Sequence, residues 1–312
     1  MKTLTRNETA EFLQNHDNYC ILTHRRPDGD TARSAAALCL GLRKMGKRAH
    51  VLKNPEISGK LAFLHEGLTK ASPDRKDTLV SVDTAAEYML TRGFTGGKIL
   101  LRIDHHGTEA GYTENELVDP AAAACGEIVY DILMEMGAAL DARIAEALYV
   151  AISTDTGCFR FANTTAHTYA VAAACAATGA ELYPITQALF DTNSITKLRI
   201  QSWIVENTKF MMDGKLAVCA LPRALEEQAT ADDMDNISGF LRSIEGVKLC
   251  ALLRQLPDGG IRASLRAVPG YDAAAVCRKF GGGGHKGAAG VTLNMPLDQA
   301  AQTIEAEMLK MF

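Results

Sequence analysis

The sequence predicts an α/β protein. We expect a mostly parallel sheet with helices on both faces in a larger N-terminal domain, followed by a smaller α/β C-terminal domain. The first half alternates short apolar runs with stretches whose apolar residues recur every three or four positions, which is typical of strands connected by helices. The chain has 312 residues, which is more than one hydrophobic core usually organises, so two domains are expected.

Apolar patterning locates the expected elements of the N-terminal half. The short apolar runs predict strands at Cys20–Thr23, Ala49–Leu52, Leu79–Val82 and Lys98–Ile103. The stretches with helical spacing predict helices at Ala32–Met45, Gly126–Met136, Ala142–Ser153 and Ala166–Thr178. Strands that alternate with helices in this way predict parallel pairing, because a parallel pair needs a long crossover connection.

The domain boundary is predicted where this alternation stops. A helical stretch without a new strand precedes the turn signal Asp213–Gly214, and a fresh apolar run follows it. We therefore expect an N-terminal domain at 1–188, a helical linker at 189–213 and a C-terminal domain at 214–312. The turn Pro257–Gly260 predicts a hairpin in this last domain. Its expected strands and helices are Lys215–Leu221, Val247–Arg254, Ile261–Ala267, Ala273–Lys279, a strand near Gly290–Leu293, and Leu297–Met311.

Composition narrows the class of protein. Apolar residues make up 47% of the chain and charged residues 22%, a balance that supports packed cores. The N-terminal residues lack the apolar segment of a secretory signal, and no apolar run approaches the length of a membrane span. We therefore expect a cytoplasmic protein without a membrane partner. Eight cysteines lie apart without a C-x-x-C pair, which is typical of buried thiols in a reducing compartment.

Charge argues against long DNA or RNA as the main partner. The net charge is −4, whereas binding many phosphates needs a broad basic surface. Segment 245–290 nevertheless carries seven Lys or Arg residues against three acids. One basic segment suits a compact anionic substrate such as a small nucleotide or a short single-stranded RNA. The sequence leaves the oligomeric state open, with a homodimer among the options.

Polar clusters follow the ends of several apolar runs. The runs YCILT, LVSV and ILLRI lead into His24, Asp83 and the triplet Asp104–His106. The run ALYVAIST leads into Asp155, at the end of either a strand or a helix. In an open α/β sheet, ligands bind beyond the carboxyl ends of the strands, so these groups are expected to converge there.

Two further carboxylates, Asp28 and Asp30, lie in the segment RRPDGD, where Pro27 and Gly29 predict a loop that leaves both side chains free. Taken alone, an Asp in a turn usually stabilises the turn, and an Asp at a strand end is commonly a helix N-cap. Capping poorly explains five acids and three histidines in four clusters. Carboxylates and imidazoles together favour a divalent-metal site, with more ligands than one ion needs.

The order and approximate spacing of four segments resemble the four motifs of the DHH phosphoesterases: HRRPDGD, VSVD, IDHH and STDTG. The C-terminal half resembles the DHH-associated substrate domain in SLRA at 264–267 and GGGGHKGAAG at 281–290. The glycine-rich motif is similar to that of the subgroup with nanoRNases and phosphatases of pAp (3′-phosphoadenosine 5′-phosphate). The resemblance covers most of the chain.

The resemblance implies a role for each clustered residue. The implied ligands of a first metal ion are His24, Asp28 and Asp83. The implied ligands of a second ion are Asp30, Asp83, His105 and Asp155. Asp104 would orient a neighbouring side chain, and His106 would contact the phosphate or the leaving group. Mixed Asp and His ligands without cysteine favour Mn²⁺ over a thiolate-type zinc site and over Mg²⁺, so two Mn²⁺ ions per chain are expected.

The glycine run at 281–284 belongs to the expected substrate site. A bare glycine run is often only a flexible loop, but glycines also let backbone N–H groups approach an anion closely. Here a histidine and a lysine follow the run, which lies within the basic segment. The substrate contacts that the resemblance and this pattern imply are Arg266, His285, Gly283 and Gly284, with Lys286 and Arg262 as weaker candidates.

The expected function is hydrolysis of pAp, of RNAs of a few nucleotides or of linear dinucleotides by two-metal activation of water. Hydrolysis of pyrophosphate or polyphosphate by the same metal core is the enzymatic alternative, and the glycine-rich domain makes it the weaker one. A catalytically silent nucleotide-binding protein is the alternative from another class, but none of the implied ligands is missing. Arg33 stands where the family usually has a small residue, and it would either narrow the pocket or bind phosphate.

Overall fold

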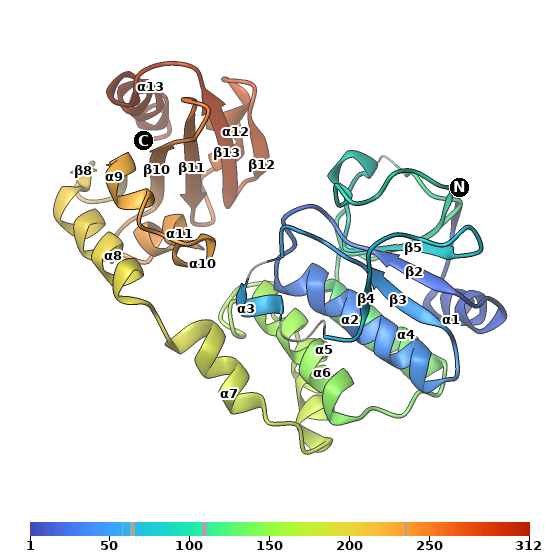
Figure 1. Ribbon diagram of the computed structural model, residues 1–312. Helices are drawn as coiled ribbons and strands as arrows, with labels where there is room; N and C mark the ends of the chain where they lie inside the picture. Colours follow the sequence, from blue (N-terminus) through green and yellow to red (C-terminus); the bar gives the residue numbers. More distant parts are fainter. Residues whose placement is uncertain (58, 63–65, 108–110, 235) are drawn as a thin grey trace. The chain divides into compact units, whose positions relative to one another are not determined.

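A computed structural model gives the fold of the chain as two compact units, Met1–Thr192 and Asn193–Phe312. Each unit has its own sheet (Figure 1). The boundary between them falls inside the segment 189–213, where the sequence predicts a helical linker. The structure describes residues 1–57, 59–62, 66–107, 111–234 and 236–312.

The first unit contains a seven-stranded sheet in the order β1-β7-β6-β5-β2-β3-β4, with every pairing parallel. The strands are β1 (Lys2–Thr3), β2 (Tyr19–Leu22), β3 (Ala49–Leu52), β4 (Thr69–Lys70), β5 (Thr78–Val82), β6 (Ile99–Asp104) and β7 (Asn115–Val118). The predicted parallel sheet and its four expected strands are therefore confirmed, as β2, β3, β5 and β6. The strands β1, β4 and β7 were not predicted, because β1 and β4 have only two residues each and half of β7, NELV, is polar.

The helices of the first unit include the four that apolar spacing predicts. They are α1 (Arg6–Asn15), α2 (Gly29–Lys44), α3 (Gly59–Ala62), the 3-10 helix η2 (Glu87–Met89), α4 (Cys125–Glu135), α5 (Ala142–Asp155), α6 (Ala166–Ala177), α7 (Leu182–Thr186) and the π-helix η3 (Gln187–Asp191). None of the helices in the described part of the chain combines the length and apolar character that a membrane span requires.

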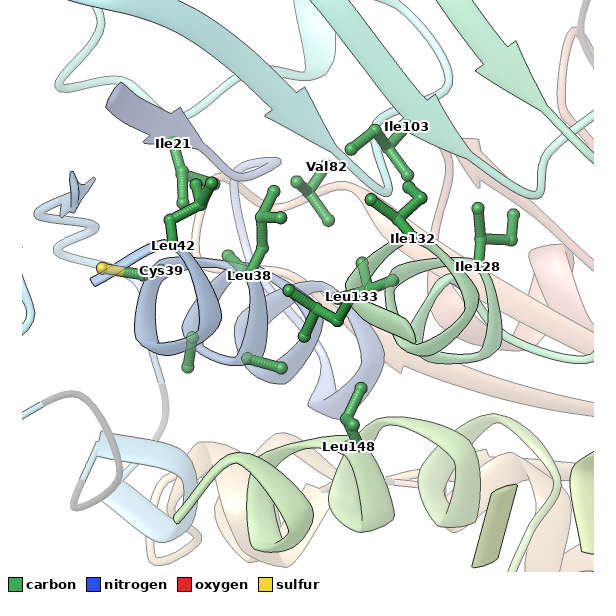
Figure 2. Packing of buried hydrophobic residues seen from close by; sticks show 14 of the residues in the cluster. Ile21, Leu38, Cys39, Leu42, Val82, Ile103, Ile128, Ile132, Leu133 and Leu148 are labelled. Atoms are coloured by element: carbon green, nitrogen blue, oxygen red, sulfur yellow. The ribbon is translucent and has the colours of Figure 1, made fainter. Parts of the chain in front are cut away.

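The main core lies between the sheet, the helices α2 and α4, and an outer layer formed by α5 (Figure 2). Ile21 and Val82 point from the sheet toward Leu38 on α2, and Leu148 on α5 approaches α2 from the other side. These side chains are fully buried. Each contributes about 1.5–3 kcal/mol through removal of its apolar surface from water, and this packing fixes α2 and α5 relative to the carboxyl ends of the strands.

The two faces of the sheet are covered differently. The long helices α1, α2 and α4 pack on one face. The predicted cover of long helices is observed on this face, whereas the opposite face packs against the segment that follows the 3-10 helix η2, through Leu90 and Phe94. Glycines 93, 96 and 97 in this connection disfavour a long helix. The strand residues of this second face are Cys20, Leu22, Leu52, Leu79 and Ile99.

The second unit contains a mixed six-stranded sheet in the order β12-β13-β11-β10-β9-β8. Only the β9–β10 pairing is parallel, and the predicted hairpin is confirmed as β10 and β11. The strands are β8 (Lys209–Met211), β9 (Leu216–Leu221), β10 (Leu249–Gln255), β11 (Ile261–Ala267), β12 (Gly283–His285) and β13 (Ala288–Leu293). The helices are α8 (Ile195–Asn207), α9 (Arg223–Glu226), α10 (Ala231–Met234), α11 (Ile237–Arg242), α12 (Ala273–Arg278) and α13 (Leu297–Leu309).

The glycine run of the second unit differs from a flexible loop. Gly283 and Gly284 begin the edge strand β12, which pairs with β13. Gly284 has φ 135°, and a Cβ there would lie 2.6 Å from the carbonyl oxygen of Ala288. Glycine is needed at this position because the two strands approach too closely for a side chain.

Candidate metal centre

The candidate site lies where the carboxyl ends of three parallel strands meet the ends of two helices. His24 lies just beyond β2, Asp83 follows β5, and Asp104 is the last residue of β6. Asp155 is the last residue of α5, so its run ends as a helix rather than a strand. The predicted convergence at the carboxyl edge of the sheet is therefore observed.

The segment with Asp28 and Asp30 is not the free loop that the sequence suggests. Helix α2 already begins at Gly29, and the Asp28 carboxylate caps it by accepting a hydrogen bond of 3.0 Å from the Thr31 amide. A Cβ on Gly29 would lie 2.3 Å from Thr154 Cγ2 on α5. Glycine at this position lets the start of α2 pack closely against α5, with the Asp28 carboxylate at the N-cap and the Asp30 carboxylate in the first turn.

Asp30 is fully buried and held in one orientation. Its oxygens accept hydrogen bonds from the Ser34 hydroxyl at 2.7 Å and from the amides of Cys125 and Gly126 at 2.6 and 3.0 Å. These two amides belong to the first turn of α4, where the helix dipole favours a negative charge. Burial and the charge of Asp83 nevertheless raise the pKa of Asp30 well above its ordinary value.

Asp83 lies at the centre of the cluster, and its backbone has the left-handed φ of 51°. Its Oδ2 accepts a hydrogen bond of 2.5 Å from the Thr31 hydroxyl. Its Oδ1 is buried without a hydrogen-bond partner among the described residues and lies 3.5 Å from both His105 Nε2 and His106 Nδ1. Burial, followed by the charge of Asp28, raises the pKa of Asp83 to about 6.

His105 faces three carboxylates with one ring nitrogen. Its Nε2 lies 3.4 Å from Asp155 Oδ2, 3.5 Å from Asp83 Oδ1 and 3.8 Å from Asp30 Oδ2. The other nitrogen, Nδ1, lies 3.2 Å from the carbonyl oxygen of Ala122. Such a hydrogen bond to a backbone carbonyl places the proton on Nδ1 and leaves Nε2 as a lone-pair donor toward the carboxylates.

His106 is oriented by a buried pair of charges. Asp104 Oδ1 accepts hydrogen bonds from the His106 amide at 3.0 Å and from His106 Nδ1 at 2.8 Å. Asp104 Oδ2 accepts from Arg102 Nε at 3.0 Å, and the Arg102 side chain is fully buried. The hydrogen bond to Asp104 raises the pKa of His106 to about 9. Burial alone would raise the pKa of Asp104, but its bonds to His106 and the charge of Arg102 bring it below the ordinary value.

The donor atoms of the cluster suit divalent cations. Burial, followed by the charges of Asp28 and Asp83, raises the pKa of Asp155 to about 8, because neighbouring carboxylates repel one another. A cation among them would relieve this repulsion and satisfy the buried Asp83 Oδ1. In this cluster, three groups of three described residues have donor atoms that all lie within 4.8 Å of one another: His24, Asp28 and Asp83; Asp30, His105 and Asp155; and Asp83, His105 and His106.

Sequence reasoning did not single out several residues that shape this site. Thr31 donates to Asp28 through its amide and to Asp83 through its hydroxyl, and the amides of the first turn of α4 hold Asp30. Only tertiary structure brings these groups together. Arg102 did leave a signal, because a charged residue inside the apolar run ILLRI is unusual for a buried strand.

The expected substrate contacts lie in the second unit. In the sheet register, Arg266 of β11 and His285 of β12 are both opposite Ala288 of the intervening strand β13. Their side chains therefore share one face, with backbones roughly 9–10 Å apart. Gly283 and Lys286 are exposed, the latter in the turn between β12 and β13. A Cβ on Gly290 would lie 2.4 Å from Arg262 Nη2, so the Arg262 guanidinium crosses this face as well.

Arg33 does not face an open pocket. Its side chain is fully buried and donates a hydrogen bond to the carbonyl oxygen of Leu61. Burial lowers its pKa to about 9. Of the two roles that the sequence suggested for Arg33, phosphate binding does not fit this placement, because the guanidinium is directed into the protein between α2 and α3.

Carboxylates and imidazoles that converge at the carboxyl edge of a parallel sheet are typical of metal-dependent hydrolases. Comparison with known proteins gives the family. The DHH family N-terminal domain matches residues 18–152, and the DHHA1 domain matches residues 213–310. The chain belongs to the DHH family and is a phosphoesterase. DHH phosphoesterases are metal-dependent, in agreement with the acidic and histidine groups described above.

Relatives with known names span nearly the whole chain. The bifunctional oligoribonuclease and PAP phosphatase NrnA of Thermus thermophilus is 33% identical over 289 residues, which cover 91% of this chain and 87% of that protein. The NrnA of Bacillus subtilis is 29% identical and covers 92% of this chain and 93% of that protein. A crystal structure of an exopolyphosphatase-related protein from Bacteroides fragilis superimposes with a TM-score of 0.88 at 20% identity. It covers 98% of this chain and 95% of that one, and it shows the shared fold.

Proposed function

We propose that this phosphoesterase hydrolyses short oligoribonucleotides, linear dinucleotides or pAp, and that it uses two divalent cations, Mn²⁺, for the reaction. The names of its relatives support the substrate class, because those proteins are bifunctional oligoribonucleases and PAP phosphatases that align along almost the full chain. The net charge of −4 supports a small substrate over a long nucleic acid.

The observation that carries the proposal is the pair of donor groups joined by Asp83. We assign His24, Asp28 and Asp83 to one ion, since their donor atoms lie within 4.8 Å of one another. We assign the group formed by Asp30, His105 and Asp155 to a second ion. His105 Nε2 lies 3.5 Å from Asp83 Oδ1, which supports Asp83 as a ligand shared by both ions.

Bound divalent ions would activate water and neutralise the oxygens of the phosphoryl group. The side chains of the protein supply the remaining contacts. His106 is held by Asp104 through Nδ1, so its Nε2 is left to donate to a phosphoryl or leaving-group oxygen. The hydrogen bond to Asp104 raises the His106 pKa and so favours the protonated, donating form of the ring.

We further propose that the second unit binds the nucleotide portion of the substrate. Arg266 and His285 lie on one face of its sheet, in the same register row, and Arg262 crosses that face. Burial lowers the Arg266 pKa, with the nearby charges of Arg242 and Arg262 acting in the same direction. An anionic phosphate would offset this concentration of positive charge. Gly283, Gly284 and Lys286 complete the proposed contacts.

The decisive assay compares four substrates in parallel with the purified chain and Mn²⁺: pAp, a diribonucleotide, an RNA of about 24 nucleotides and pyrophosphate. We expect turnover of pAp or the diribonucleotide, with kcat/KM for the long RNA lower by on the order of tenfold or more, because one basic segment neutralises only a few phosphates. Asp83→Ala should abolish turnover. Asp298→Ala, which removes an exposed carboxylate on α13, is the matched control and should keep it. Turnover of pyrophosphate alone would refute the nucleotide assignment.

Two further properties stay predictions. We propose that the chain acts in the cytoplasm, as its scattered cysteines suggest, and all eight are free thiols. A homodimer is the assembly that we would test first, by light scattering on the full chain across a concentration series. A constant monomer mass would exclude it.

A further inference from the structure

We propose that Cys20, His50 and Asp77 form a binding site for one zinc-type divalent cation, separate from the candidate catalytic cluster. Cys20 lies in β2, His50 in β3, and Asp77 immediately precedes β5. All three positions are near the amino ends of parallel strands, whereas the catalytic candidates follow the carboxyl ends. Along β2, Cys20 and His24 are about 13 Å apart.

The strand register brings the donors together. Cys20 and His50 are direct partners in the β2–β3 pairing, so their side chains lie on the same face of the sheet. This is the face opposite the long helices, where Cys20 is fully buried. The Cys20 sulfur, a His50 ring nitrogen and an Asp77 carboxylate oxygen all lie within 4.8 Å of one another.

The distance between two of the donors matches tetrahedral coordination. His50 Nε2 lies 3.4 Å from Asp77 Oδ2. Zinc bonds to nitrogen and oxygen of about 2.0–2.1 Å, set at a tetrahedral angle, place the two ligand atoms about 3.4 Å apart. The two groups are in ion-pair contact but are not hydrogen-bonded, and His50 Nε2 is buried without a hydrogen-bond partner among the described residues.

Neighbouring groups orient the Asp77 carboxylate and pair the positive charge of Lys70. Asp77 Oδ2 accepts a hydrogen bond of 2.6 Å from the Asp74 amide, which fixes the carboxylate toward His50. The charge of Lys70 acts on both Cys20 and His50, but the Lys70 ammonium is paired with the Asp74 carboxylate. A cation between the three donors would satisfy the buried imidazole nitrogen, which forms no hydrogen bond with the described residues.

The donor set points to a thiophilic metal. Thiolate, imidazole and carboxylate are the ligands of protein zinc sites, with water as a fourth ligand, whereas the catalytic candidates contain no sulfur. The thiolate is the form that binds a metal, so binding at Cys20 releases the proton of the thiol. Since the three ligands come from β2, β3 and the start of β5, the bound ion would crosslink the sheet and stabilise the first unit.

The test uses the full chain loaded with Co²⁺, a spectroscopic substitute for zinc. A thiolate bound to Co²⁺ gives a near-ultraviolet charge-transfer band, and ligands of nitrogen and oxygen alone do not. The band therefore reports this site without interference from the catalytic cluster. We expect the band in the unmodified chain, its displacement by Zn²⁺, and a higher Tm in the presence of Zn²⁺.

Variants distinguish this site from adventitious thiol binding. Cys20→Ser and His50→Gln, the latter at a half-buried position, should each abolish the band and the Tm increase, with catalytic turnover retained. Cys39→Ser, which changes another fully buried cysteine of the same unit, should keep both signals. Circular dichroism checks that each variant is folded. The proposal is overturned if the unmodified chain gives no band, or if the band survives either Cys20→Ser or His50→Gln.

Discussion

Arg102 should control the orientation of His106 without touching a metal or the substrate. Its guanidinium is fully buried, donates to Asp104 Oδ2 through Nε at 3.0 Å and through Nη2 at 2.5 Å, and lies 5.6 Å from the centre of the Tyr112 ring. Asp104 in turn holds His106 Nδ1 at 2.8 Å. The side chain of Met has a similar length but no charge, so Arg102→Met removes one partner of a buried ion pair.

The expected cost is large because the Asp104 carboxylate stays behind in the interior. Removal of one member of a buried pair typically lowers the free energy of unfolding by about 3–5 kcal/mol. The bond between Asp104 and His106 offsets part of this loss, so we expect about 3 kcal/mol. Arg102→Lys keeps the charge but cannot form the same two hydrogen bonds to the carboxylate. Its free energy of unfolding should therefore lie between those of the unmodified chain and of Arg102→Met.

Loss of Arg102 should also lower kcat, which a purely structural role of this residue would leave unchanged in the folded protein. When a residue that orients a catalytic or ligating group is removed, activity typically falls by about 10–100-fold. We expect that fall in kcat for pAp at a temperature where Arg102→Met is fully folded, with KM and metal content unchanged. Urea unfolding, steady-state kinetics and metal analysis measure the three quantities. A folded Arg102→Met variant with unaltered kcat would refute the reasoning.

The remaining predictions concern the ligands, the substrate contacts and the helix start. Asp83→Ala should lose at least one metal ion and all turnover with the fold retained, and two retained ions with near-normal activity would contradict the assigned site. His285→Ala and Arg266→Ala should reduce turnover of pAp more than that of p-nitrophenyl phosphate at unchanged metal content, and equal losses with metal loss would contradict a substrate role. Gly29→Ala should lower the free energy of unfolding by about 1–3 kcal/mol, because the new Cβ meets Thr154, and an unchanged urea midpoint would contradict that packing.

The parallel sheet could be predicted from the sequence because the apolar patterns of its strands and helices are local. The strands β2, β3, β5 and β6 and the four main helices carry strong apolar patterns, so their existence could be predicted from short windows. The start of α2 was placed three residues too late, because Pro27 and Gly29 suggest a loop. What overrides that local preference is contact with α5, where Gly29 packs against Thr154.

The residue types of the candidate site could be predicted from the sequence, because the carboxylates and imidazoles follow the ends of apolar runs and resemble the motifs of one family. How these groups act on one another depends on tertiary structure. The fold buries Asp83 Oδ1 without a hydrogen-bond partner among the described residues, directs the amides of α4 at Asp30, and sets Arg102 behind Asp104. It also joins Cys20 with His50 across neighbouring strands. These residues are far apart in sequence, and no local pattern encodes a register or a distance between separate elements, because both result from the packing of the whole sheet.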